Sequence, residues 1–171
     1  MRRWLFIFML LCTAIFAETT ASNIQLNDRE SLISFFDTCS VKSALDLLSS
    51  LDKCTKKLEI LYGVSLNNFT CKKGRKILAK FDFDDRESCY LLSAMNAVSS
   101  ESINEVDYPT SFIIGGIELM VGTLIYILPV PLAKHVGAAV IADGSRRVFN
   151  GIEDLSDLQK EALLDFSYVT E

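Results

Sequence analysis

The chain has 171 residues, a formal net charge of −5 and a hydrophobic share of 50%. This length suits one domain, or one domain with an anchor. The acidic balance argues against a nucleic-acid partner, because phosphate contacts require clustered lysine and arginine. The nearest approach to a basic patch, from Lys72 to Lys80, is followed at once by Asp82, Asp84 and Asp85, which cancel most of its field.

The first 17 residues have the pattern of an export signal. Arg2 and Arg3 form a positive start, residues 4–16 form an apolar stretch, and Ala17 stands at a suitable cleavage point before Glu18. The apolar stretch is short for a transmembrane helix. Removal of the two arginines lowers the net charge from −5 to −7. The sequence therefore predicts an acidic exported protein, periplasmic or secreted, with a signal peptide over residues 1–17.

Five cysteines are present, and one of them, Cys12, lies in the signal. Leu11 before it is not the small residue that a lipoprotein site needs. The others are an even number in a compartment that permits oxidation, which favours two disulfides. No Cys-x-x-Cys pair is present, so a four-thiolate zinc site is disfavoured. The predicted disulfide cysteines are Cys39, Cys54, Cys71 and Cys89.

Helical geometry limits how these cysteines can pair. If residues 41–54 are helical, Cys39 and Cys54 lie about 20 Å apart, too far for a disulfide. Two connectivities remain: 54–89 with 39–71, or 54–71 with 39–89. The first is favoured, because antiparallel helices bring residues 54 and 89 together.

Residues 18–26 form a flexible start in our interpretation, and residues 27–98 form a disulfide-stapled helical region. Asn27 with Glu30 resembles a capping box that opens a short helix. Ser40 is a candidate cap for a longer amphipathic helix that Gly63 ends. The short helix carries Phe35 and Phe36, and the longer one carries Val41, Ala44, Leu45, Leu48, Leu51, Leu58, Leu61 and Tyr62.

The next segment begins with a loop over residues 63–75 and continues as a helix or a short strand over residues 77–83. Asp84 with Glu87 then predicts a helix start. The helix that follows has an apolar stripe made of Tyr90, Leu91, Ala94, Met95 and Val98. The polar residues 99–110 form the predicted linker.

Residues 111–169 are predicted to form an apolar helical hairpin followed by an amphipathic helix. Two apolar arms rich in glycine and alanine flank Pro129-Val130-Pro131, which we take as the turn. Positions equidistant from about residue 131 then face each other, so Glu118 lies opposite the stretch from Asp143 to Arg146. Arg146, or Arg147 beside it, can neutralise Glu118, and we take Glu118 and Arg146 as the candidate buried ion pair.

The end of the chain carries two further signals. Gly151 is expected to break the second arm. Ser156 with Gln159 is then expected to cap the last helix, whose apolar stripe is Leu158, Leu163, Phe166 and Tyr168.

Three interpretations of the apolar segment remain open. It can be the buried centre of a small, irregular, all-α bundle that the amphipathic helices cover. Residues 112–132 can instead span a bilayer once, with Lys134, Arg146 and Arg147 on the cytoplasmic side. The hairpin can also insert conditionally, which makes membrane lipid a partner. Glu118 and the two prolines argue against a simple span.

The residue inventory gives little support to catalysis, and we predict no catalytic residue, cofactor or metal. His135 is the single histidine, and a position beside Lys134 after a proline turn is typical of an exposed residue. Glu118 and Asp143 are the one carboxylate pair that could perform glycosidase-like chemistry, but an arginine partner explains Glu118 more simply. The sequence therefore predicts an exported, non-catalytic helical protein that acts by interaction or structure, with an unknown protein partner. The alternative is a membrane-anchored or membrane-inserting protein that uses residues 112–142.

Overall fold

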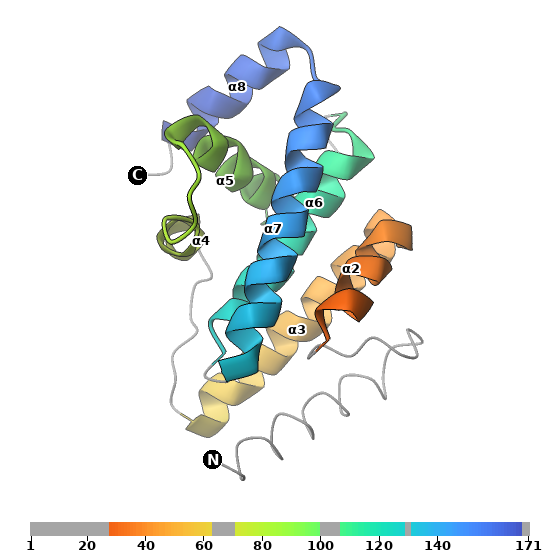
Figure 1. Ribbon diagram of the computed structural model, residues 1–171, viewed down its shortest axis with the longest axis vertical. Coiled ribbons are helices and arrows are strands. Elements are labelled where there is room, and N and C mark those ends of the chain that lie inside the picture. The colour runs from red at the N-terminus through yellow and green to blue at the C-terminus, as the bar shows by residue number, and fades with distance from the viewer. Residues whose placement is uncertain (1–27, 63–70, 100–106, 129–130, 169–171) are drawn as a thin grey trace. The chain divides into compact units, whose positions relative to one another are not determined.

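The computed structural model describes residues 28–62, 71–99, 107–128 and 131–168. Side chains are described throughout these ranges except at 54–62, 71–73, 131 and 166–168. The described residues form seven α-helices and no strand, so the predicted all-α class is confirmed (Figure 1). The predicted signal peptide, the flexible start and most of the linker lie outside the described residues.

The chain divides into two compact units, and two helices contribute to both. The helices that run from one unit into the other are α6 (Thr110–Tyr126) and α7 (Pro131–Glu153). Residues 121–140 belong to the first unit, and residues 68–120 and 141–171 belong to the second.

The first unit contains two helices whose starts are set by side-chain caps. Asp28 caps α2 (Arg29–Thr38) by accepting a hydrogen bond from the backbone N–H of Glu30 at 3.1 Å. The sequence predicted Asn27 for this role, and Asn27 lies outside the described residues. Ser40 caps α3 (Val41–Tyr62), since its hydroxyl accepts a hydrogen bond from the Ser43 N–H at 3.2 Å. Among the side chains that the structure describes on α2 and α3, the buried apolar ones are Leu32, Phe36, Ala44, Leu47 and Leu51.

In the second unit, α4 (Cys71–Leu78) begins within the segment that the sequence predicted as a loop. The sequence predicted a loop here because glycine has a low intrinsic helix propensity. In the structure Gly74 is buried in the helix, where a Cβ atom would lie 2.9 Å from Cε of Met95 on α5 (Asp85–Ser99). Gly74 thus packs against α5, and this tertiary contact outweighs the low helix propensity of glycine.

The start of α5 follows the predicted capping box. Asp84 Oδ1 accepts a hydrogen bond from the Glu87 N–H at 2.7 Å, and Glu87 Oε2 accepts one from the Asp84 N–H at 3.0 Å. All five residues of the predicted apolar stripe on α5 are buried. Helices α4 and α8 (Asp157–Tyr168) both contact α5. One buried hydrogen bond joins α5 to α8, from the Ser93 hydroxyl to the Leu163 carbonyl at 2.7 Å.

Two sequence predictions about the C-terminal part are corrected. Gly151 does not break the chain, because α7 continues to Glu153. A Cβ atom at Gly151 would lie 2.6 Å from the backbone nitrogen of Phe112, so this glycine serves close helix packing. Ser156 and Gln159 cap α8 as expected, but Leu158 is 79% exposed and does not share the buried face of Leu163.

The structure does not support the predicted disulfide staples. Cys39 and Cys89 are half-buried thiols, and each belongs to a disulfide in both predicted connectivities. The Cys39 thiol donates to the Phe36 carbonyl, with a sulfur-to-oxygen distance of 3.8 Å. The side chains of Cys54 and Cys71 lie outside those described.

The apolar segment from Phe112 to Leu132 is shared by two helices, since α6 ends at Tyr126 and α7 begins at Pro131. None of the helices in the described ranges combines the length and the apolarity that crossing a membrane requires.

Candidate functional site

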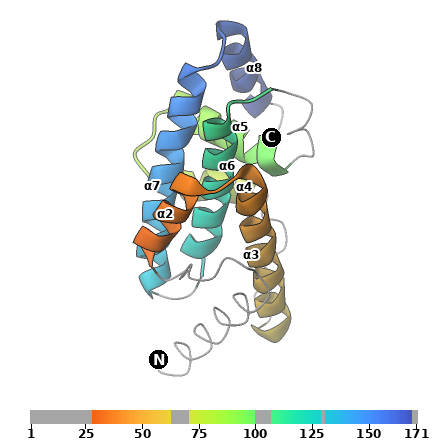
Figure 2. The same cartoon turned by 90° about the vertical axis from the view of Figure 1, so that its right-hand side faces the viewer.

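The candidate site lies where α6 and α7 meet in the second unit, and glycines set their separation. A Cβ atom at Gly115 would lie 2.8 Å from the carbonyl oxygen of Gly144 and 2.8 Å from the backbone nitrogen of Val148. A Cβ atom at Gly144 would lie 3.0 Å from the backbone nitrogen of Leu119. Because these neighbours are backbone atoms, the two helices approach each other closely at the glycines. Both ribbon views show α6 and α7 running side by side (Figures 1 and 2).

Glu118 lies on α6 inside this contact and is completely buried, with an exposed fraction of 0%. Arg147 on α7 donates from Nε to Glu118 Oε2 at 2.8 Å. The guanidinium is itself largely buried, with 15% of the side chain exposed. A buried carboxylate is costly without a cation or hydrogen-bond donors, so Arg147 is the group that makes Glu118 tolerable here.

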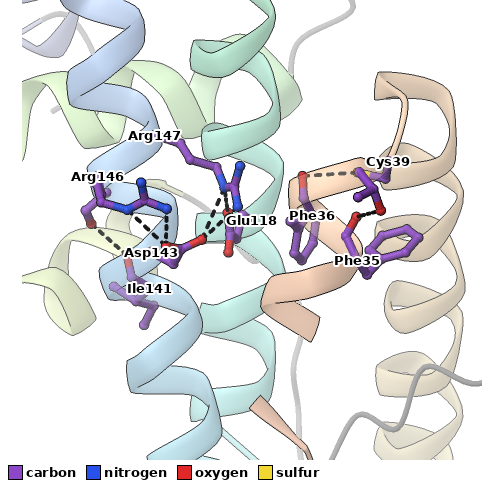
Figure 3. Close-up of polar contacts among 10 residues, drawn as sticks. Phe35, Phe36, Cys39, Glu118, Ile141, Asp143, Arg146 and Arg147 are labelled. Atoms are coloured by element: carbon purple, nitrogen blue, oxygen red, sulfur yellow. Dashed lines mark hydrogen bonds and ion pairs between the residues drawn. The ribbon is translucent and has the colours of Figure 1, made fainter. Parts of the chain in front are cut away.

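Asp143 supplies a second carboxylate to the same arginine (Figure 3). Arg147 donates to Asp143 Oδ2 from Nη2 at 2.9 Å and from Nε at 3.2 Å. Arg146 donates to the other oxygen, Oδ1, from Nη2 at 2.7 Å and from Nε at 3.1 Å. Asp143 is thus held between two arginines, whereas the arginine that bonds to Glu118 is Arg147.

The partner of Glu118 is therefore Arg147, and the predicted pair with Arg146 is corrected. Arg146 is 59% exposed and bonds to Asp143 on its own helix. Asp143 and Arg147 are four residues apart, so they share one face of α7, and that face is turned toward α6. This i,i+4 spacing was the sequence signal that could have selected Arg147.

The pKa values of the two carboxyl groups are shifted in opposite directions. Burial raises the pKa of Glu118 to about 8, Arg147 opposes this rise, and the nearby Asp143 adds to it. For Asp143, burial also acts to raise the pKa, but the hydrogen bonds and charges of Arg146 and Arg147 outweigh it and lower the pKa below its usual value. Near neutral pH, the lowered pKa of Asp143 corresponds to an ionised acid, and the raised pKa of Glu118 corresponds to an acid that retains its proton.

One oxygen of Glu118 is left unsatisfied. Oε1 is buried and has no hydrogen-bond partner among the residues that the structure describes. Buried polar atoms are nearly always paired, so an unpartnered carboxyl oxygen needs a physical reason. A neutral carboxyl group tolerates such a position better than an anion does, in agreement with the raised pKa of Glu118.

The structure brings together Glu118 and Asp143, the one carboxylate pair that the sequence offered for glycosidase-like chemistry. Such chemistry needs both acids to reach a sugar and a water molecule. Glu118 has no exposed surface, and both carboxyl groups are bound to Arg147. The geometry fits a structural ion cluster better than a reaction centre.

The other residues that the sequence offered as candidates are exposed. His135 is exposed on the part of α7 that belongs to the first unit. Asp82, Asp84 and Asp85 are exposed, and Asp84 is used as the cap of α5. Among the described residues, no group of three or more histidine, cysteine, aspartate or glutamate side chains is placed to hold a metal ion.

Comparison of the chain with protein-family models, curated proteins and solved structures finds no match.

Proposed function

We propose that this chain is an exported, non-catalytic helical protein that acts through interaction or structure outside the cytoplasm. The observation that carries the proposal is the state of Glu118, the acid that the sequence singles out most strongly. Its carboxyl group is sealed between two helices and bound by Arg147. A side chain in this position stabilises helix packing and has no access to a substrate.

The architecture that goes with this role is a small helical bundle built around the hairpin of α6 and α7. Its support in the second unit is the close packing on both sides of α6. A Cβ atom at Gly116 would lie 2.7 Å from the Ala94 carbonyl oxygen on α5, while Gly115 faces α7 in the same way. A helix that contacts neighbours through backbone atoms on two faces is suited to a central position.

Export is supported by the sequence pattern of residues 1–17, and one fractionation experiment tests it. The full chain is expressed with a C-terminal tag, and the mature N-terminus is determined by mass spectrometry. We expect cleavage before Glu18 and recovery of the mature protein in the supernatant after alkaline carbonate extraction of membranes. An uncleaved cytoplasmic product would overturn export, and recovery in the pellet would favour the membrane alternative.

A second experiment tests the non-catalytic part of the proposal. The purified mature protein is assayed on a panel of aryl glycosides, next to Glu118→Gln and to the exposed control Glu161→Gln. We expect none of the three proteins to release the aryl group. Cleavage by the wild type and by Glu161→Gln, but not by Glu118→Gln, would establish Glu118 as a catalytic acid.

A further inference from the structure

The buried part of the ion cluster contains more carboxyl groups than cations. Glu118 and Asp143 converge on one guanidinium, that of Arg147, while Arg146 reaches only the outer oxygen of Asp143 (Figure 3). Two ionised carboxylates on one buried cation repel each other, and this repulsion favours uptake of one proton. Glu118 is the group to take it, because Asp143 has two arginines and Glu118 has an oxygen without a partner.

Among the described residues, Arg147 and Asp143 are the charged groups that shift the pKa of Glu118. From α7, the charged groups are Asp143, Arg146 and Arg147. On α5, which packs on α6 at Gly116, the atoms nearest to that glycine belong to Ala94 and Val98, and neither residue can titrate. The protonation of Glu118 is thus decided by the α7 groups and by burial.

We propose that Glu118 is a proton-dependent latch between α6 and α7. It keeps its proton while the two helices are packed and releases it when they separate, so the contact weakens from acidic toward alkaline solution.

The glycine contacts explain why the proton and the packing are coupled. An ionised Glu118 needs water or a further donor at Oε1, the oxygen that has none. A Cβ atom at Gly144 would lie 3.2 Å from Cβ of Glu118, so the two helices pack closely around this residue, and we expect hydration of Oε1 to require that they move apart. Separation returns the carboxyl group to its ordinary pKa of 4.5, well below the value of about 8 in the packed state.

The sign of the pH effect follows from these two values. The open state binds fewer protons than the packed state between pH 4.5 and about pH 8. The equilibrium constant for opening therefore rises by up to about tenfold for each pH unit in this window and is constant above it.

Hydrogen exchange of the full mature protein measures this constant. Exchange is followed across residues 112–120 and 141–150 at several pH values, and the wild type is compared at each pH with Glu118→Gln. The comparison cancels the intrinsic pH dependence of exchange. We expect the ratio of the two rates to rise with pH up to about pH 8, because glutamine keeps the shape of the protonated acid and cannot ionise. The exposed control Glu153→Gln, also on α7, keeps the wild-type profile.

A constant ratio across the window overturns the latch. A second measurement on the wild type does not depend on the variant being folded: the carboxyl carbon of Glu118 is assigned by through-bond NMR and titrated. A midpoint far above that of an ordinary glutamate supports the latch, and a midpoint near 4.5 overturns it.

Discussion

Replacing Gly115 with alanine tests whether the backbones of α6 and α7 meet as the structure shows. The added methyl group would lie 2.8 Å from the Gly144 carbonyl oxygen, 2.8 Å from the Val148 nitrogen and 2.9 Å from Val148 Cγ2. Real Cβ atoms do not approach neighbours this closely, and two of the three atoms are backbone. The new atom is therefore accommodated only when one helix shifts away from the other.

The magnitude comes from two opposing effects. Alanine in place of glycine within a helix gains about 1 kcal/mol in helix propensity. Overpacking a tight interface costs about 1–3 kcal/mol, and the upper part of this range applies when rigid backbone must move. We expect a net loss of about 1–2 kcal/mol, which corresponds to a Tm lower by about 2–8 °C for a chain of this size.

Gly74→Ala is the matched control, because Gly74 is also a buried helical glycine of the second unit. Its added methyl group would meet the flexible end of Met95, at 2.9 Å from Cε and 3.3 Å from Sδ. That side chain can turn aside, so the gain in helix propensity dominates, and the Tm is expected to rise by a few degrees. Thermal unfolding followed by circular dichroism gives both values. Equal increases in Tm for the two variants would refute the proposed backbone contact.

Three further predictions concern the buried polar groups. Arg147→Met leaves Glu118 and Asp143 without their common donor and is expected to lower the free energy of unfolding by about 3 kcal/mol, whereas Arg146→Ala, at an exposed position, costs under about 1 kcal/mol. Equal losses in urea titrations would contradict the assignment of Arg147. Ser93→Ala removes the buried hydrogen bond to α8 and is expected to cost about 1 kcal/mol, seen as faster hydrogen exchange in α8; unchanged exchange there would argue against that bond. The lowered pKa of Asp143 stabilises the fold above its unfolded value of 3.8, and this contribution is lost as the pH falls through the lower folded pKa. Asp143→Asn should therefore flatten the acid limb of stability against pH, and an unchanged limb would count against this role.

Local signals in the sequence located most of the helices. The reciprocal cap of Asp84 and Glu87, the hydroxyl of Ser40 and the pair of Ser156 and Gln159 all appear at helix starts in the structure. These motifs work within four residues, so a single sequence contains all the information that they need. The start of α4 was missed because its packing partner, Met95, is distant in the sequence.

The candidate site was predicted in its composition but not in its pairing. An acid in an apolar segment has to be neutralised, which is why Glu118 could be singled out with a cluster of arginines across the turn. Which arginine meets it depends on the rotation of α7 about its axis, and neighbouring positions on a helix point about 100° apart. Arg146 was the predicted partner, and in the structure Arg147 is the arginine that turns inward.

By itself, the sequence determined the all-α class and the need to bury the segment around Glu118, because hydrophobic periodicity, caps and the cost of an isolated charge are local properties. Only the tertiary structure decided that Gly151 continues a helix, that Cys39 and Cys89 are thiols, and that Glu118 shares Arg147 with Asp143. Each of these depends on which atoms from distant parts of the chain come within a few ångströms of one another. Gly151 continues the helix because it packs closely against Phe112, whereas the local sequence around this glycine predicts a helix end.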